Sequence, residues 1–147
     1  MRNQARKKLD TLFLCHMVSA LACGLICVIK PRWFLLFLHE TLPMNTAGYE
    51  VSETIIRLYG SLIFAQAWLV KNTRESSDAK VRKSFVEAYA VAFGLTTLVL
   101  LYAQYVEHFS RFNCLNVIFF MSLCAGYSYF VFIEKISTFS LGNGEEQ

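Results

Sequence analysis

Two pairs of ionisable side chains stand where apolar stretches begin or end, and they are the first candidates for chemistry. Glu53 and Arg57 open one apolar stretch, and Glu107 and His108 follow the end of another. Ionisable groups are costly to keep at the edge of a membrane-crossing stretch, so they are functional-site candidates by default. The functions they could support are small-ligand binding or an enzymatic reaction.

Arg57 lies about one turn inside its apolar stretch. An arginine costs roughly 2.5 to 3.5 kcal/mol at the centre of a bilayer, and it therefore normally faces headgroups, water or a partner. Glu53 precedes Arg57 by one helical turn and shares its face. We therefore expect Arg57 to reach back to the membrane surface and to pair with Glu53. The alternative is that Arg57 is the hub of a buried polar site.

Four apolar stretches position these residues. The chain has 147 residues, of which 55% are hydrophobic, a high value for a soluble domain of this size. Each stretch comes near the roughly 20 residues that cross a bilayer, the second only when Arg57 and the residues just before it are included. The sequence predicts an all-α membrane protein, a four-transmembrane-helix bundle at residues 11–135, between a basic tail, 1–10, and a mobile tail, 136–147. The predicted spans are residues 11–29, 54–70, 86–106 and 112–133.

The distribution of basic residues predicts the topology. Cytoplasmic loops are rich in Lys and Arg, so both termini and the central loop should be cytoplasmic. The net charge of +3 is too small to suggest nucleic-acid binding. The endoplasmic reticulum, or another endomembrane, is expected from fold-level analogy. The basic residues on the predicted cytoplasmic side are Arg2, Arg6, Lys7, Lys8, Lys71, Arg74, Lys80, Arg82, Lys83 and Lys135.

This topology places both candidate pairs at the extracytoplasmic side. Arg57 and Glu53 begin the second span there, and Glu107 and His108 end the third. Glu50 and Glu40 fall on the same side. The predicted cluster is either a salt-bridge clasp that holds the two spans together or a site for a ligand or a reaction.

Smaller patterns predict how the helices begin and pack. Residues 33–38 are too short to cross a membrane and should lie in the interface after the first span. Ser84 and Glu87 match a capping box at the start of the third span. Pairs of small residues four apart let helices approach closely in lipid. These pairs are Ala20 and Gly24, Ser61 and Ala65, Ala90 and Gly94, and Ser122 and Gly126.

The histidines and the five cysteines do not form a recognisable metal or haem site. His16 falls on the opposite side of the membrane from His39 and His108, and two histidines without a third ligand make a poor zinc site. The cysteines lack metal-type Cys-x-x-Cys spacing. We therefore expect neither metal nor cofactor and no catalytic residue, and we expect His16 to form a hydrogen bond inside the bundle.

Several short motifs resemble the tumour protein p53-inducible protein 11 family over roughly residues 54–132. The resemblance implies a small multi-span endomembrane protein linked to restraint of cell proliferation and migration, without established catalytic residues. This chain lacks the long polar N-terminal extension associated with that family. More loosely, the layout is similar to four-span scaffolds that gather sterol-synthesis enzymes. The motifs are Arg57-Leu58-Tyr59-Gly60 within residues 55–60, Glu87-Ala88, and Tyr127-Ser128-Tyr129.

The sequence and this resemblance together predict a small membrane adaptor or regulatory protein, not an enzyme. A scaffold for lipid-metabolising or sterol-metabolising enzymes is the first alternative. The second alternative is a small-ligand or enzymatic site at the extracytoplasmic cluster. The expected partners are membrane lipids, other membrane proteins and further copies of the chain.

Overall fold

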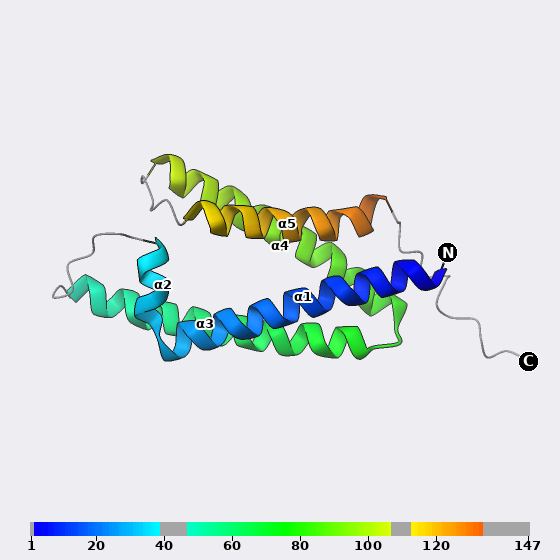
Figure 1. Ribbon diagram of the computed structural model, residues 1–147, viewed down its shortest axis with the longest axis horizontal. Helices are drawn as coiled ribbons and strands as arrows, with labels where there is room; N and C mark the ends of the chain where they lie inside the picture. The colour runs from blue at the N-terminus through cyan, green and yellow to red at the C-terminus, as the bar shows by residue number, and fades with distance from the viewer. Residues whose placement is uncertain (1, 39–46, 107–112, 134–147) are drawn as a thin grey trace, which may run out of the picture.

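The computed structural model describes residues 2–38, 47–106 and 113–133. Within these residues the fold is built from helices (Figure 1). At 1.5 Å of rise per residue, the four longer helices are about 30 to 44 Å long, and the hydrocarbon core of a bilayer is about 30 Å thick. The helices are α1 (Arg2–Ile29), α2 (Pro31–Leu38), α3 (Ala47–Glu75), α4 (Ala79–Val106) and α5 (Asn113–Phe132).

Three helices are long and apolar enough to cross a membrane: Arg6–Ile29 within α1, then Ala79–Val106 and Asn113–Phe132. Only 28%, 17% and 22% of their most apolar windows are buried inside the protein. Exposed apolar surface on this scale is unusual for a soluble monomer and suits contact with lipid. The prediction of an all-α membrane protein is confirmed at this level.

Helix α3, which contains the predicted second span, is not among these three. It is as long as α1, but Glu50, Glu53 and Arg57 lie near its start. Lys71 and Arg74 lie near its end. The apolar stretch between these charges falls short of the roughly 20 residues that cross a bilayer unaided.

The prediction that Ser84 caps the helix of the third span was wrong. Helix α4 begins at Ala79, because Asp78 caps it: the Asp78 Oδ1 atom accepts a hydrogen bond from the Lys80 backbone N–H at 2.7 Å. The pairing of Ser84 with Glu87 therefore lies inside the helix and is not a capping box. Glu87 instead lies 3.8 Å from the Lys83 ammonium, one turn away.

The helices pack as two antiparallel pairs (Figure 1). Helix α1 lies against α3, and α4 lies against α5, while the short α2 contacts both α1 and α3. The short connection between α4 and α5 in the sequence is typical of antiparallel neighbours. We call these pairs the α1/α3 pair and the α4/α5 pair.

Glycines bring α1 and α3 into direct backbone contact. A Cβ atom on Gly24 would lie 2.8 Å from the backbone nitrogen of Phe64 and 3.0 Å from the carbonyl oxygen of Gly60. A Cβ atom on Gly60 would lie 2.5 Å from the Cβ of Cys27. The small residue at Gly24 was predicted to pack. Its partner is Gly60, whereas the predicted pair at 61 and 65 is exposed.

The two helix pairs join at one end, where the chain enters α1. The core there is formed by the first half of α1, the first half and the middle of α4, the last turns of α3 and the second half of α5. Figure 1 shows the pairs diverging toward the other end, where α2 lies. The buried residues of this core are Leu9, Phe13, Val70, Val86, Phe93, Leu123, Tyr127 and Phe130.

A buried ion pair ties the two helix pairs together at the same end. The Arg82 guanidinium on α4 donates to the Asp10 carboxylate on α1, and it lies over the Phe13 ring at 5.5 Å. The Arg82 side chain is 2% exposed, and its Nε atom has no hydrogen-bond partner among the described residues. The sequence placed Arg82 in a polar loop. That prediction was wrong because α4 begins earlier, which puts Arg82 on the same buried stripe as Val86.

Replacing Gly24 by Ala should destabilise the protein, because the new methyl group would clash with backbone atoms of α3. Such a clash is relieved only if the two helices move apart. We expect a loss of about 1 to 3 kcal/mol in the free energy of unfolding, the usual cost of overpacking. Unfolding in detergent, followed by circular dichroism, measures it. Gly94→Ala is the matched control, since a Cβ atom there lies at an ordinary 3.6 Å from the Cys124 sulfur. Equal losses in both variants would contradict the proposed backbone contact.

Replacing Asp10 by Ala should leave the buried Arg82 charge without its partner. We expect a loss of about 3 kcal/mol, the lower end of the range for breaking a buried pair, because Asp10 is partly exposed. Glu87→Ala breaks an ion pair whose members are each about half exposed and should cost less than about 0.5 kcal/mol. Combining Asp10→Ala with Arg82→Met should restore much of the stability. Failure of the double variant to recover would argue against an uncompensated charge.

Candidate functional site

The candidate site lies where α1 ends and the chain turns back into α2. Lys30 interrupts the helix, and Pro31 begins α2, a position that proline favours because its missing N–H is not needed there. The Trp33 N–H closes the turn on the Lys30 carbonyl at 3.0 Å. Phe34 then packs against Cys27 of α1 and Ile56 of α3. This packing holds the start of α2 beside the start of α3.

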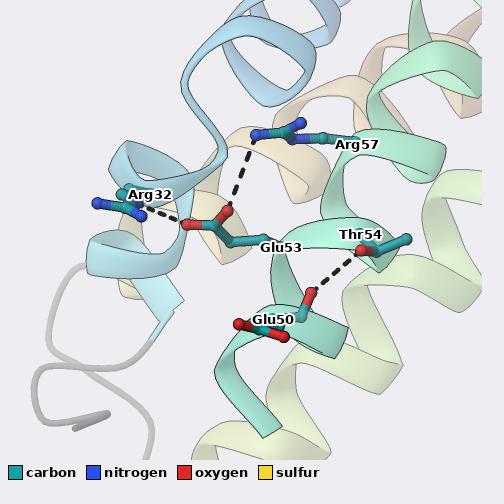
Figure 2. A network of polar contacts seen from close by, with 5 residues as sticks. All are labelled: Arg32, Glu50, Glu53, Thr54 and Arg57. Carbon is teal, nitrogen blue, oxygen red and sulfur yellow. Dashed lines mark hydrogen bonds and ion pairs between the residues drawn. The ribbon is translucent and has the colours of Figure 1, made fainter. Parts of the chain in front are cut away.

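Two arginines from different helices meet one carboxylate at this place (Figure 2). The Arg32 Nε atom donates a hydrogen bond to the Glu53 Oε1 atom at 2.6 Å. The Arg57 Nη2 atom lies 3.8 Å from the other carboxylate oxygen, Oε2. The Glu53 side chain is only 17% exposed, whereas those of Arg32 and Arg57 are 67% and 57% exposed. Glu53 is therefore the fixed centre, and the arginines open toward the surroundings.

The neighbouring contact drawn in Figure 2 supports the helix and adds no charge to the site. The Thr54 hydroxyl donates to the backbone carbonyl of Glu50 at 3.1 Å. A hydroxyl that bonds to the carbonyl four residues earlier is a common local contact within helices. It involves the backbone of Glu50 and leaves the Glu50 carboxylate out of the contact.

The arginines border a pocket of about 340 Å³. Among the described residues, its lining carries three cationic side chains, Lys30, Arg32 and Arg57, and one carboxylate, that of Glu53. This described lining therefore has a surplus of two positive charges. A pocket with guanidinium donors and this surplus suits an anion, above all a phosphate or a carboxylate. The remaining lining residues are Ile29, Pro31 and Trp33.

The predicted site residues are placed in part. Glu53 and Arg57 pair one turn apart as the sequence predicted, and the half-exposed Arg57 matches a side chain that reaches toward the surface. Glu107, His108 and Glu40 lie outside the described residues. The predicted clasp between the second and third spans therefore stays a prediction. The clasp that the structure describes joins α2 to α3.

Sequence reasoning missed Arg32 as a member of the site. Arg32 follows the first predicted span, and no site was assigned to that stretch. The useful signal was Pro31, because proline favours the first position of a helix and therefore indicates that a new helix begins there. Pairing Arg32 with Glu53 across 20 intervening residues nevertheless requires knowing how α2 folds back.

The prediction that His16 forms a hydrogen bond inside the protein is confirmed. Its Nδ1 atom lies 2.7 Å from the Tyr127 hydroxyl, and the ring is buried among aromatic rings. Tyr89 and Phe93 meet it edge to face, with ring centroids 4.8 and 5.0 Å away. Among the described residues, no three His, Cys, Asp or Glu side chains gather closely enough to hold a metal ion.

Comparisons with known proteins give no further assignment. No protein-family model matches this chain, and no curated protein and no solved structure matches it. The resemblance to the tumour protein p53-inducible protein 11 family thus stays a prediction from the short motifs in the sequence. The pocket beside Arg32, Glu53 and Arg57 is therefore the feature of the described residues that bears most directly on function.

Proposed function

We propose that this protein is a four-span integral membrane protein that binds the phosphate headgroup of a membrane phospholipid. The binding site is the pocket beside Arg32, Glu53 and Arg57, which we call the headgroup pocket. The main support for this proposal is that two guanidiniums from separate helices share one carboxylate beside a pocket. The described lining of this pocket has a surplus of two positive charges.

The geometry of the arginines suits a phosphate. Guanidinium groups present several donors in a plane and hold phosphate oxygens in pairs. Glu53 orients Arg32 through a short hydrogen bond. Arg57 approaches Glu53 only to 3.8 Å, which is beyond hydrogen-bond length. A bound phosphate would give Arg57 a closer partner and would neutralise the surplus charge of the pocket.

The spacing of polar groups along the helices supports α3 as a fourth span. Asp10 and Lys30 on the first segment are about 30 Å apart at 1.5 Å per residue, and Glu53 and Arg74 on α3 are about 32 Å apart. Both separations match the thickness of the hydrocarbon core. Between its charged ends, α3 exposes large apolar side chains, among them Leu58 and Leu62 at 63% and 68%. Helix α3 also lies alongside α1.

In this arrangement the headgroup pocket faces the extracytoplasmic leaflet. Its Trp33 is 60% exposed, which suits the interface where tryptophan rings gather. The basic ends of α1, α3 and α4 then face the cytoplasm, as do both termini. The assignment to the endoplasmic reticulum, and the roles as regulatory adaptor or enzyme scaffold, stay predictions from the sequence and its resemblance.

The fourth span can be tested by labelling single cysteines from one side of intact vesicles, in a background from which the five native cysteines have been removed. We expect Lys7→Cys and Ser77→Cys to react from the same side, and Trp33→Cys to react from the other. The reason is that α3 must cross once between residues 33 and 77. If Trp33→Cys and Ser77→Cys share a side, α3 does not span the membrane.

The headgroup pocket can be tested by native mass spectrometry of the purified protein with dioleoylphosphatidylglycerol. Replacing both Arg32 and Arg57 by Gln should weaken binding by about tenfold or more, because charge-assisted hydrogen bonds are lost. The matched control replaces Lys80 and Lys83 by Gln, which removes the same charge from exposed positions at the start of α4. Binding by the control should stay within about twofold of the wild type.

Two further measurements separate specific binding from general charge effects. Competition with inorganic phosphate distinguishes a free anion from a lipid headgroup: it should displace the lipid only weakly if the acyl chains contribute. Equal weakening in both double variants would mean that the protein attracts anionic lipid by net charge alone. That result would overturn the headgroup pocket and would leave the four-span topology untouched.

A further inference from the structure

A second pocket, of about 110 Å³, lies between the two helix pairs. All four long helices contribute to its lining. It includes Phe93 and Leu123 of the core that joins the two helix pairs. Because it is lined from the middle parts of the helices, it is at the depth of the hydrocarbon core in the four-span arrangement. Its polar lining residues include His16, Ser19, Tyr59, Gln66 and Thr96.

The chemistry of this pocket differs from that of the headgroup pocket. Its described lining contains no Asp, Glu, Lys or Arg. Aromatic and aliphatic side chains form most of the remaining wall, for example Phe119 and Ile63. An apolar pocket with a few polar groups at fixed positions is the usual form of a site for an uncharged ligand. A phosphate, with its charge, would be excluded from such a site by the cost of desolvation.

His16 supplies the polar contact. Its side chain is 2% exposed and lines the pocket. The Nδ1 atom is occupied by the Tyr127 hydroxyl, which is not part of the lining. The second ring nitrogen, Nε2, takes no part in that contact. A ligand hydroxyl that reaches Nε2 gains a hydrogen bond in a site that is otherwise largely apolar.

The volume limits what can enter. A cavity of about 150 Å³ accepts a benzene molecule. A pocket of about 110 Å³ therefore holds one end of a lipid, and the rest of the molecule lies outside the pocket. A hydroxyl group suits His16 in either tautomer, because a hydroxyl both donates and accepts.

We propose that the pocket beside His16 binds the hydroxyl-bearing end of an uncharged membrane lipid. This site is separate from the headgroup pocket and does not depend on it, because neither Arg32 nor Arg57 lines it. The ligand class is a membrane-soluble alcohol whose hydroxyl meets His16 and whose apolar part meets the aromatic wall.

The test uses two photoreactive probes on the purified full-length protein in lipid nanodiscs. One probe is a long-chain alkyl alcohol that carries a diazirine, and the other is its methyl ether. Labelled peptides are mapped by mass spectrometry. We expect the alcohol to label peptides around residues 16–23 and 92–96. The ether should label them about fivefold less, because it cannot donate a hydrogen bond and its methyl group takes up space.

Two leucine substitutions on α4 show whether the labelled place is this pocket. Ala92 lines the pocket and is exposed, so Ala92→Leu should fill the entrance without disturbing the core and should reduce labelling by about fivefold or more. Ala88 is exposed one turn earlier and lies outside the lining, so Ala88→Leu should leave labelling unchanged. Equal labelling by both probes, or equal effects of both substitutions, would overturn the proposal.

A third variant tests His16 itself. His16→Phe keeps an aromatic ring and removes both nitrogens, and it should lower labelling by the alcohol to the level of the ether. Circular dichroism shows whether this variant folds. If it does not, the comparison of Ala92→Leu with Ala88→Leu tests whether the labelled site is the pocket beside His16. The double Gln variant of Arg32 and Arg57 should label like the wild type, and a loss of labelling there would contradict the independence of the two sites.

Discussion

The close contact of α1 and α3 at Gly24 and Gly60 is the constraint on which the rest of the structure depends. In lipid, helices gain little from burying apolar side chains, so association depends on close packing of small residues. Because the two backbones touch, Cys27 and Ile56 come close enough for Phe34 to pack on both. That packing sets the direction in which α2 returns, and therefore where Arg32 meets Glu53. The headgroup pocket is thus a consequence of two glycines that lie inside the helices.

The second constraint is the way in which the two helix pairs are held together. They share a core and the buried ion pair of Asp10 and Arg82 at one end only. A buried arginine is expensive, and its Nε atom remains without a partner among the described residues, so this contact is better suited to fixing the register of α1 and α4 than to adding stability. Because one end is fixed while the other diverges, a pocket can form between the pairs beside His16.

The sequence predicted the features that depend on residues close together in the chain. Apolar length predicted the three helices that are long and apolar enough to cross a membrane, the spacing of Glu53 and Arg57 predicted their pairing, and the isolated His16 predicted a buried hydrogen bond. Contacts between residues far apart in the sequence were not predicted. The ion pair of Arg82 was missed because its partner, Asp10, lies 72 positions away, and Arg32 was overlooked because only the fold of α2 brings it to Glu53. The start of α4 failed for a different reason: two local capping patterns competed, and Asp78 formed the cap in place of Ser84.

The placement of polar groups follows depth in the membrane and explains why two different sites can coexist. In the proposed four-span arrangement, charged side chains gather at the helix ends, where headgroups and water can solvate them, and the surplus of guanidiniums over carboxylates in the described lining suits an anion. His16 then lies at the depth of the hydrocarbon core, where polar groups must find partners within the protein or in a bound molecule. Tyr127 contacts one ring nitrogen of His16, and the ring lines a pocket whose described lining carries no charge. An anion is therefore favoured at the first depth and an uncharged alcohol at the second, for the same reason: the free energy of desolvation rises steeply toward the middle of the bilayer.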